Sequence, residues 1–257
     1  VYDGLHLDGF MCKLAGMLMG NTAENLVEKY SISREEQDQF ALESHQKASK
    51  AVAEGKFDVE IIPIEVTVKK KGKVVVDKEE IPRANASLEA MLKLPPVFKK
   101  DGGTVTAGNS CALSDCASAV VIMSEEKAKS LGLTPMARVR SYAVAGVDPN
   151  YMGIGPVAAT PIALKKAGLT LDDIDFIELN EAFAAQYIAC EKELKLDRSK
   201  VNVHGGAIAL GHPVGATGTK LITTNINTLK MYDKTFGLIT ACVGGGQGFA
   251  VVLERLS

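Results

Sequence analysis

The chain has 257 residues, of which 46% are hydrophobic and 23% are charged, with a formal net charge of −2. This is the composition of an ordinary globular protein, and the lack of a basic excess argues against a nucleic-acid-binding surface. No apolar run approaches the roughly 20 residues that span a bilayer, so we expect no membrane partner. We see no signal-peptide pattern and no paired CxxC motif among the five cysteines. We therefore expect a cytoplasmic protein.

The N-terminal third contains one clear helix. Residues 1–20 are rich in Gly, Leu and Met without a regular period, so we expect a loop that packs on another part of the protein. A helix is predicted from Arg34 to Glu54, because Ser33 is a good N-cap and Glu36 completes a capping box. Gly55 follows as the C-terminal stop. The segment is polar and alanine-rich, so we expect it to face the solvent.

Two strand-like stretches follow this helix, and a third lies further along the chain. Residues 61–68 alternate weakly and contain a proline, which predicts an edge strand. A lysine-rich turn at 69–73 returns the chain into a second strand at 74–76. The apolar run Ala119–Met123 is rich in β-branched residues and precedes Ser124, a helix cap. We expect this run to be a strand whose neighbours come from outside the chain.

From Pro135 onward the pattern alternates between strands and helices. A loop is expected at 152–156. We expect strands at 138–147, 176–179, 237–241 and 249–253, and helices from Thr160 to Gly168, from Asn180 to about Leu196, and from Thr217 to Met231. This alternation indicates a layered α/β domain. Polar motifs follow the strand ends, where such sheets place their sites.

Two glycine-rich motifs near the C-terminal end carry candidate chemistry. They are Gly211-His212-Pro213-Val214-Gly215 and Cys242-Val243-Gly244-Gly245-Gly246. A His and a Cys delivered to one site indicate acid/base work at a carbonyl or thioester. The glycines leave backbone N–H groups open to a developing oxyanion. For either motif alone, a buried side chain in a glycine-rich corner is an equal alternative.

These motifs resemble the thiolase family, of the acetyl-CoA acetyltransferase type. Three further segments match that family in order and spacing, namely 104–109 (TVTAGN), 180–183 (NEAF) and 205–213 (GGAIALGHP). The resemblance implies an α/β fold, the thiolase-like layered fold (αβαβα), with an incomplete N-terminal half in this chain.

The resemblance also implies a division of the chain into three parts. These are a loop domain at 1–112 that covers the active site, the last strand and helix of the N-terminal half at 113–134, and a C-terminal thiolase domain at 135–257. The family's region with the nucleophilic cysteine has no counterpart here, and Cys111 and Cys116 match its motif poorly. We therefore expect either a missing segment or a smaller partner chain that carries this N-terminal half.

The implied reaction is that of an acetyl-CoA C-acetyltransferase, in fatty acid metabolism. Two acetyl-CoA molecules would condense to acetoacetyl-CoA and CoA, or the reverse thiolysis would run. In this reading Cys242 moves the proton at the acetyl α-carbon, and His212 donates to an oxyanion and helps to activate the nucleophile. Asn180 holds a water that completes the same oxyanion hole, and the Gly244 N–H contributes to a second one. We expect no metal and no cofactor beyond the coenzyme A thioester that is the substrate.

The resemblance extends to binding residues. Met19 and Met152 match residues that line a short acyl pocket, and Phe98 matches an aromatic residue that packs on coenzyme A. Arg83 matches an arginine near the nucleotide end of that molecule. The expected substrate- and CoA-binding residues are Met19, Arg83, Phe98, Ala107, Met152, Ala182 and Phe183.

Other histidines and other functions rank lower. His6 and His45 are expected at the surface, while His204 is a candidate supporting residue because it lies near His212 in the sequence. One alternative is a ketoacyl synthase-like enzyme of the same fold, against which Cys242 argues, since those enzymes generally carry a second His there. Another is a non-catalytic CoA-binding or scaffolding subunit. We expect a homo- or hetero-oligomer, either a dimer or a tetramer.

Overall fold

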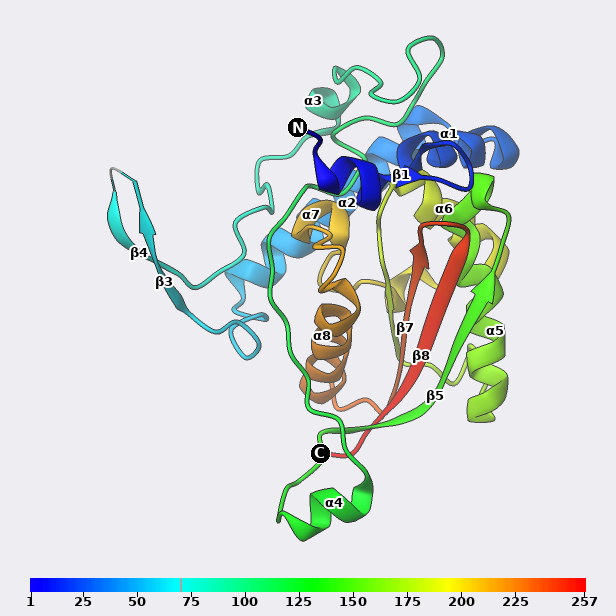
Figure 1. Cartoon of the computed structure of the whole chain (residues 1–257). Helices are drawn as coiled ribbons and strands as arrows, with labels where there is room; N and C mark the ends of the chain where they lie inside the picture. The colour runs from blue at the N-terminus through cyan, green and yellow to red at the C-terminus, as the bar shows by residue number, and fades with distance from the viewer. Residues whose placement is uncertain (70) are drawn as a thin grey trace.

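A four-stranded sheet forms the centre of the computed structural model, which describes residues 1–69 and 71–257 (Figure 1). The strand order is β5-β8-β7-β6, with bounds Ala137–Gly146 for β5, Gln247–Arg255 for β8, Phe236–Val243 for β7 and Phe176–Leu179 for β6. Strand β6 runs parallel to β7, whereas β8 is antiparallel to both of its neighbours. The four strands expected after Pro135 are confirmed.

Helices cover both faces of this sheet, and Figure 1 shows α5 and α8 on opposite sides of it. Helix α8 spans Thr217–Met231, as predicted, and α6 spans Ala184–Leu194 and packs against α5. The main core joins α5, α6 and the sheet through Ala159, Ala163, Ile177, Leu179, Ile188 and Leu238. The molecule therefore has the layered α/β arrangement that the alternating pattern predicts.

Helix α5 begins earlier than expected. It spans Gly155–Ala167, with Pro156 in its first turn and Pro161 inside it. The expected loop at 152–156 is instead a 3-10 turn, η2 (Pro149–Ile154), that runs into the helix. Proline is favoured in the first turn of a helix, so the sequence allowed a start at either Pro156 or Pro161. The helix begins at the earlier proline, and the start predicted at Thr160 is therefore wrong. The end is confirmed, because Gly168 follows with a φ of 71°.

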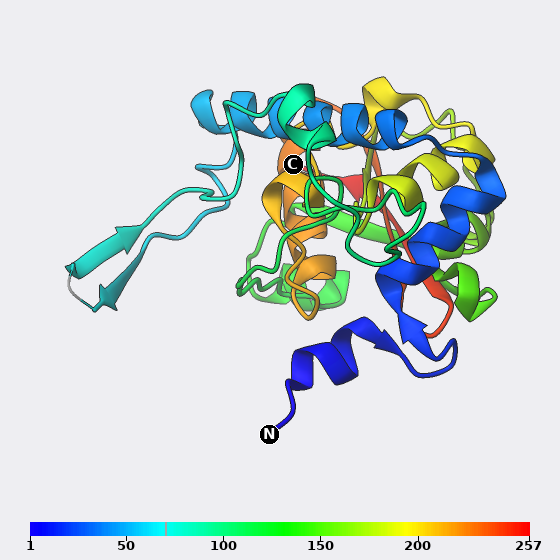
Figure 2. The ribbon, with the colours of Figure 1, turned by 90° about the horizontal axis from the view of Figure 1, so that it is seen from above.

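Helix α2 (Arg34–Ala53) begins as predicted but is not a solvent-facing helix. The Ser33 side chain accepts a hydrogen bond from the Glu36 N–H, which confirms the cap. Figure 2, seen from above, shows α2 lying across the molecule. One side of the helix is buried, including Gln37, Asp38, Phe40, Ser44 and His45. The prediction failed because polar side chains enter the interior when they find partners there, as Asp38 does with Asn109 at 2.8 Å.

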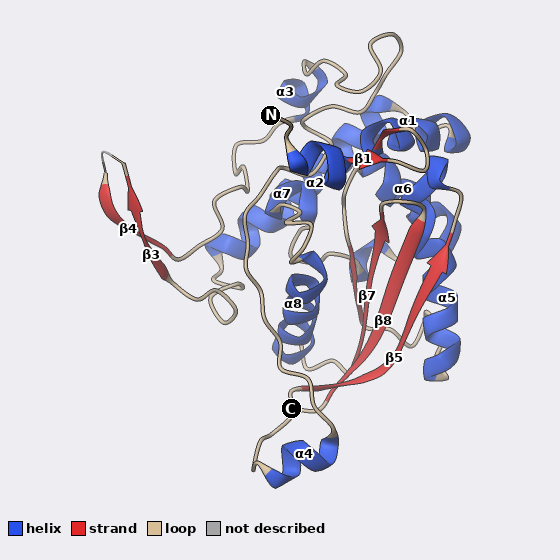
Figure 3. Cartoon of the chain, viewed as in Figure 1, coloured by secondary structure: helices blue, strands red, loops and turns tan. Residues whose placement is uncertain are grey.

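The N-terminal region and the lysine-rich hairpin both contain regular structure. Residues 1–20 are not a plain loop, because they form η1 (Leu5–Phe10), β1 (Met11–Cys12), β2 (Met17–Leu18) and the start of α1 (Met19–Tyr30). The two strands expected after α2 are confirmed as β3 (Ile64–Val68) and β4 (Gly72–Val76). This hairpin projects from the body (Figure 3). Lys70, in the predicted lysine-rich turn, lies outside the described residues.

The expected strand at Ala119–Met123 is not present. The segment between α3 (Leu88–Leu92) and α4 (Glu125–Ser130) is mostly irregular, and Val121 and Ile122 are 85% and 76% exposed. Ser124 caps α4, as predicted. An apolar run becomes a strand only where a neighbour pairs with its backbone, and within residues 1–69 and 71–257 no strand does so here. Across the same ranges, no helix has the length and hydropathy to span a membrane.

Candidate active site

Asn180 lies directly after β6, and its backbone N–H donates to the Thr240 carbonyl of β7 at 3.0 Å. Its side chain is 1% exposed, and neither the amide oxygen nor the amide nitrogen has a hydrogen-bond partner among the described residues. A cavity of about 10 Å³ borders it, lined also by Glu178, Gly211 and Thr217. That volume is about the minimum for one water molecule. A buried amide with a free donor and acceptor can therefore bind a small polar group here.

His212 lies in the turn after α7 (Ala207–Leu210), beyond Gly211, which has a φ of 82°. A side chain at Gly211 would strike Ser114, so glycine fits this turn for both reasons. The Nδ1 atom of His212 lies 2.7 Å from the Thr217 hydroxyl, which itself donates to the Pro213 carbonyl. Because the Thr217 hydroxyl proton is used in the bond to Pro213, its oxygen must accept a hydrogen bond from His212. We therefore assign the proton of the neutral ring to Nδ1. The Nε2 atom then carries a free lone pair.

Two physical effects keep the His212 ring neutral. Burial, followed by the positive charge of Lys220, lowers the pKa of His212 to about 4. Taking a charged imidazolium out of water is unfavourable, and a nearby ammonium group adds to this effect. At pH 7 the ring is therefore a proton acceptor at Nε2.

Cys242 is near the end of β7, where the chain turns into β8 through Gly245 and Gly246, at φ of 86° and 83°. The side chain is buried in an apolar cluster with Met152 and Phe183. Burial raises the pKa of the Cys242 thiol to about 12. At rest Cys242 is a protonated thiol and hence a proton donor. Burial thus acts against the lowered thiol pKa that a cationic neighbour would produce.

Most of the residues expected to bind the acyl group and coenzyme A surround this cysteine. Met19 and Phe98 are half-buried against the cluster, which comprises Ala23, Val105, Met152, Ala182, Phe183 and Cys242. The rings of Phe98 and Phe183 meet edge to face, with centroids 6.0 Å apart. A side chain on Gly244 would strike the end of Met19, so the second predicted oxyanion donor also borders this apolar cluster.

Two of the expected binding residues lie outside this cluster. Arg83 is exposed in an irregular segment, and its backbone N–H donates to Nδ1 of His45 at 3.3 Å. Ala107 is exposed in the 104–109 loop, which Asn109 holds through a hydrogen bond to the Thr106 N–H at 2.8 Å. Neither packs in the apolar cluster around Cys242.

Of the other histidines, His6 agrees with expectation, whereas His45 and His204 differ from it. His6 is exposed, as predicted, but His45 is 4% exposed, so the prediction of a surface residue is wrong. The irregular segment after β4 contacts it there, because the Arg83 N–H donates to its Nδ1 atom. His204 is buried too, and its ring nitrogens lie 3.2 Å from the Tyr232 hydroxyl and 3.4 Å from the Thr228 hydroxyl. Among the described residues none of its hydrogen bonds reaches His212, so the supporting role is not observed.

Sequence reasoning missed a buried network that joins the site to α2. Glu181 accepts hydrogen bonds from the Ser44 hydroxyl at 2.7 Å, the Asn202 amide at 2.8 Å and the Ile208 N–H at 3.2 Å. The Ser44 hydroxyl also accepts from the Gly206 N–H at 3.1 Å. The available signal was the position of Glu181, directly after Asn180 in a motif that already held a site residue.

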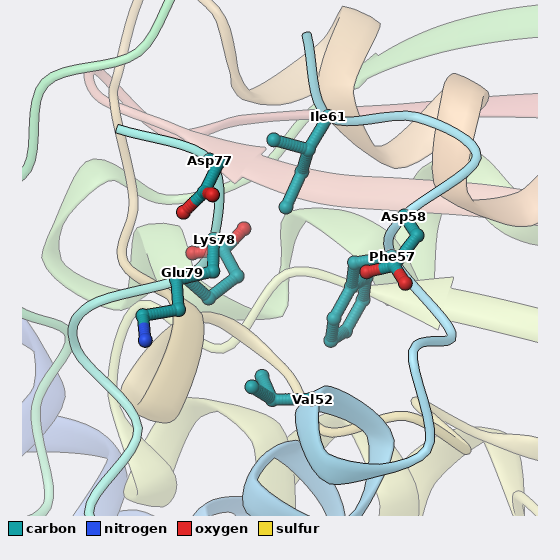
Figure 4. A pocket seen from close by; sticks show the side chains of 7 residues that line it. All are labelled: Val52, Phe57, Asp58, Ile61, Asp77, Lys78 and Glu79. Atoms are coloured by element: carbon teal, nitrogen blue, oxygen red, sulfur yellow. The ribbon is translucent and has the colours of Figure 1, made fainter. Parts of the chain in front are cut away.

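A larger pocket of about 260 Å³ lies away from the predicted residues (Figure 4). Figure 4 shows Val52 and Phe57 across the pocket from Asp77, Lys78 and Glu79, which follow β4. No expected site residue lines it, and its volume is below the usual range for ligand pockets. We assign it no role.

Comparison with known proteins identifies the family. A sequence model of the thiolase C-terminal domain matches residues 133–255, and one of the thiolase N-terminal domain matches residues 1–126. The chain belongs to the thiolase family. The match at 1–126 shows that the N-terminal domain is represented in this chain, where we expected only a loop domain and the last strand and helix of an incomplete N-terminal half. A separate smaller chain that supplies it has no support.

Individual thiolases agree with this assignment. The chain is 52% identical to an acetyl-CoA acetyltransferase from Escherichia coli over 257 residues, which is all of this chain and 65% of that protein. It is 53% identical to a 3-ketoacyl-CoA thiolase from Bacillus subtilis over 246 residues, which is 93% of this chain and 63% of that protein. The chain thus spans a little under two thirds of the length of these relatives.

Solved structures show the same fold. An acetyl-CoA acetyltransferase from Syntrophomonas wolfei matches with a TM-score of 0.94 and 46% identity, over 100% of this chain and 65% of that one. A human mitochondrial 3-ketoacyl-CoA thiolase matches with a TM-score of 0.90 and 46% identity, over 96% of this chain and 62% of that one. The thiolase-like layered fold expected from the sequence is confirmed.

Proposed function

We propose that this thiolase acts as an acetyl-CoA C-acetyltransferase, with coenzyme A thioesters as substrates. It would join two acetyl-CoA molecules into acetoacetyl-CoA and CoA, or catalyse the reverse thiolysis. One observation carries the proposal. Asn180 directly follows β6, and Cys242 lies near the end of the adjacent parallel strand β7. The turn that holds His212 borders the same cavity as Asn180. The E. coli and S. wolfei relatives, named as acetyl-CoA acetyltransferases, support it.

His212 would act first as a base. Its neutral ring, with the proton on Nδ1, can accept the proton of an attacking thiol at Nε2. The ring then presents an N–H at Nε2, and this group can donate to a thioester oxygen that gains negative charge. One side chain would thus activate the nucleophile and stabilise the oxyanion. We assign the acyl-carrying nucleophile to none of the cysteines of this chain.

Cys242 would act as the proton donor to carbon. In thiolysis the sulfur of the attacking thiol bonds to C3 of acetoacetyl-CoA, the C2–C3 bond breaks, and its electron pair stays on the α-carbon of the departing acetyl-CoA. The Cys242 S–H gives its proton to that carbon and becomes a thiolate. Its pKa, raised to about 12 by burial, keeps the thiol protonated until the carbanion forms. In condensation the same steps run backwards, and the thiolate takes the proton.

The oxyanions would be held by neutral donors. Asn180 has an unpartnered buried amide beside a cavity of about 10 Å³, and it would bind a water that donates to the same oxygen as His212. The Gly244 N–H would serve the second thioester oxygen. Donors fixed in advance in a water-poor site stabilise developing charge strongly, and the loss of one costs on the order of 10²–10³ in rate.

The acyl chain is proposed to be short. Met152 shares an apolar cluster with Cys242, and Met19 packs against the same cluster, so we expect a short acyl site at which acetoacetyl-CoA reacts well. A 3-ketoacyl-CoA of about sixteen carbons should react poorly, and Met152→Ala should narrow the difference. Comparable wild-type turnover of both would instead favour a 3-ketoacyl-CoA thiolase, the name of the B. subtilis relative.

The central test is thiolysis of acetoacetyl-CoA by the whole protein and by His212→Ala, Cys242→Ser and Asn180→Ala. Each variant should lose roughly 10²-fold or more in kcat. Cys116→Ser is the matched control, since Cys116 is exposed and should leave the rate unchanged. Near wild-type rates in the first two variants would contradict the assigned roles. An inactive wild type that still binds CoA would favour a non-catalytic subunit.

The compartment and the assembly also remain proposals. We infer a cytoplasmic protein that forms a dimer or a tetramer, as expected from the sequence. The native mass of the purified protein, with all of its chains identified, tests the assembly.

A further inference from the structure

Helix α2 holds two different parts of the site through consecutive residues. The Ser44 hydroxyl bonds both Glu181 and the Gly206 N–H, and so it reaches the turn that leads to His212. The next residue, His45, turns its ring to the segment after β4. There its Nδ1 atom accepts a hydrogen bond from the Arg83 backbone N–H at 3.3 Å, and the side chain is 4% exposed.

The segment that His45 holds has few other fixed points. Residues 77–87 contain no helix or strand, so their backbone lacks a ladder of hydrogen bonds. Ile81 packs close to Gly211, since a Cβ there would lie 2.8 Å from the end of its side chain. The Arg83 carbonyl accepts from the Ala86 N–H at 3.1 Å. The Arg83 side chain itself is exposed, so its direction depends on where this backbone is fixed.

We propose that His45 is a positioning residue for the nucleotide end of coenzyme A, because its unprotonated Nδ1 fixes the Arg83 backbone so that the guanidinium can meet a phosphate group. This inference rests on the proposed function and on the expectation from the sequence that Arg83 lies near the nucleotide end of coenzyme A. A side chain that loses its anchor must be ordered again on binding, and this weakens affinity without altering the chemistry at the thioester.

The bond depends on the protonation of His45. Burial, followed by the charge of Arg83, lowers the pKa of His45 from its ordinary value. The nearby turns of α2 and the adjoining helix α7 add no titratable side chain at Ala41, Leu42, Ala48, Ser49 or Ala207–Leu210. The segment after β4 also carries Asp77, Lys78, Glu79 and Glu80, yet beside burial it is Arg83 that shifts the pKa of the ring.

The direction of the pH effect follows from this. The ring is neutral at pH 7, and the hydrogen bond is intact. When the pH falls through the lowered pKa, Nδ1 gains a proton, faces the Arg83 N–H as a second donor, and places a positive charge beside the guanidinium. The bond is then lost, and the segment is released.

The test compares substrates with and without the nucleotide. Using the whole protein, kcat and KM are measured for acetoacetyl-CoA and for acetoacetyl-pantetheine between pH 5 and pH 8. Wild type is compared with His45→Asn, whose amide oxygen stands close to the position of Nδ1 and does not titrate, and with His45→Leu, which has no acceptor. Melting temperatures establish that each variant is folded.

The expected result is selective for coenzyme A. In wild type KM for acetoacetyl-CoA should rise about fivefold at the acidic end, the equivalent of one ordinary hydrogen bond, whereas KM for the pantetheine substrate stays level. His45→Asn should remove this acidic rise. His45→Leu should raise KM for acetoacetyl-CoA about fivefold at every pH and leave kcat unchanged.

Other outcomes would overturn the inference. An acidic rise in KM that persists unchanged in His45→Asn would show that another group titrates. Equal changes for both substrates would show a general structural effect rather than one on the nucleotide end. A wild type that turns over neither substrate would instead count against the proposed function, and the two failures are thus distinguishable.

Discussion

Replacement of Glu181 by alanine should both destabilise the protein and slow its reaction. The carboxylate is 2% exposed and joins α2, the 201–206 turn and α7, because Ser44, Asn202 and the Ile208 N–H all donate to it. A side chain on Gly206 would strike the carboxylate, which shows how closely the turn packs on it. The change would therefore leave both unpaired donors and an empty space.

The magnitude follows from what each donor can do afterwards. The Asn202 amide keeps its bond to the Leu179 carbonyl at 2.8 Å, and the Ser44 hydroxyl can rotate. The Ile208 N–H has no other acceptor within reach among the described contacts, and an unpaired buried donor costs about 1–3 kcal/mol. The lost packing adds about 1–2 kcal/mol. Burial raises the pKa of Glu181, so its removal also regains some desolvation. We expect a net loss of about 3 kcal/mol.

The assay is urea unfolding, monitored by circular dichroism. Glu126→Ala, at an exposed position, is the control, and its free energy of unfolding should differ from that of wild type by less than about 0.5 kcal/mol. In addition, kcat should fall about tenfold, because Ile208 lies in the helix that leads to His212 and a small misplacement slows catalysis. A double-mutant cycle with Ser44→Ala isolates their hydrogen bond, which should contribute about 1 kcal/mol. A Glu181→Ala protein as stable as wild type would refute this expectation. So would a Ser44→Ala change that lowers the free energy of unfolding equally in wild type and in Glu181→Ala.

Two further predictions concern glycine and a second buried acid. A methyl group at Gly155 would strike the Gln247 backbone, so Gly155→Ala should destabilise the protein by about 2 kcal/mol or more. A methyl group at Gly218 in α8 would have its nearest neighbour at 3.8 Å, so Gly218→Ala should stabilise the protein by up to about 1 kcal/mol. Equal unfolding midpoints for the two variants would contradict this. Burial, and then Glu60, raise the pKa of Glu178 to about 8. The free energy of unfolding of wild type should therefore fall as the pH rises from about 5 to about 8.5. Glu178→Gln lacks this titration, so its stability relative to wild type should increase by a few kcal/mol over the same range. Parallel stability curves would exclude the effect, and Glu126→Gln is the control.

The C-terminal part of the fold was predictable because local pattern and final environment agree there. Phe176–Leu179 is apolar except for Glu178 and is bounded by polar residues, and it is a buried strand. The failures have one cause in common. Whether α2 is buried, or whether 119–123 is a strand, depends on partners far away in the sequence, such as Asn109 for Asp38. A polar composition predicts exposure only where no such partner exists.

The candidate site was predictable in its residues but not in its electrostatics. His212 and Cys242 could be predicted as site residues because each has a side chain that can transfer a proton and lies in a glycine-rich motif. Their pKa values depend on burial and, for His212, on Lys220, which only the folded chain brings near. The same holds for His45, a helical residue in a polar segment whose hydrogen bond to Arg83 spans 38 positions.

The position of β8 has a consequence for how the protein is made. It is the last strand in the sequence, yet it lies between β5 and β7 in the sheet. Its partner β5 is synthesised about a hundred residues earlier, as the pairing of Ala137 with Arg255 shows. During translation β5 remains unpaired on this side until the residues up to the end of β8 have been synthesised. Such long-range closure slows folding and leaves an unpaired edge open to aggregation until β8 has left the ribosome.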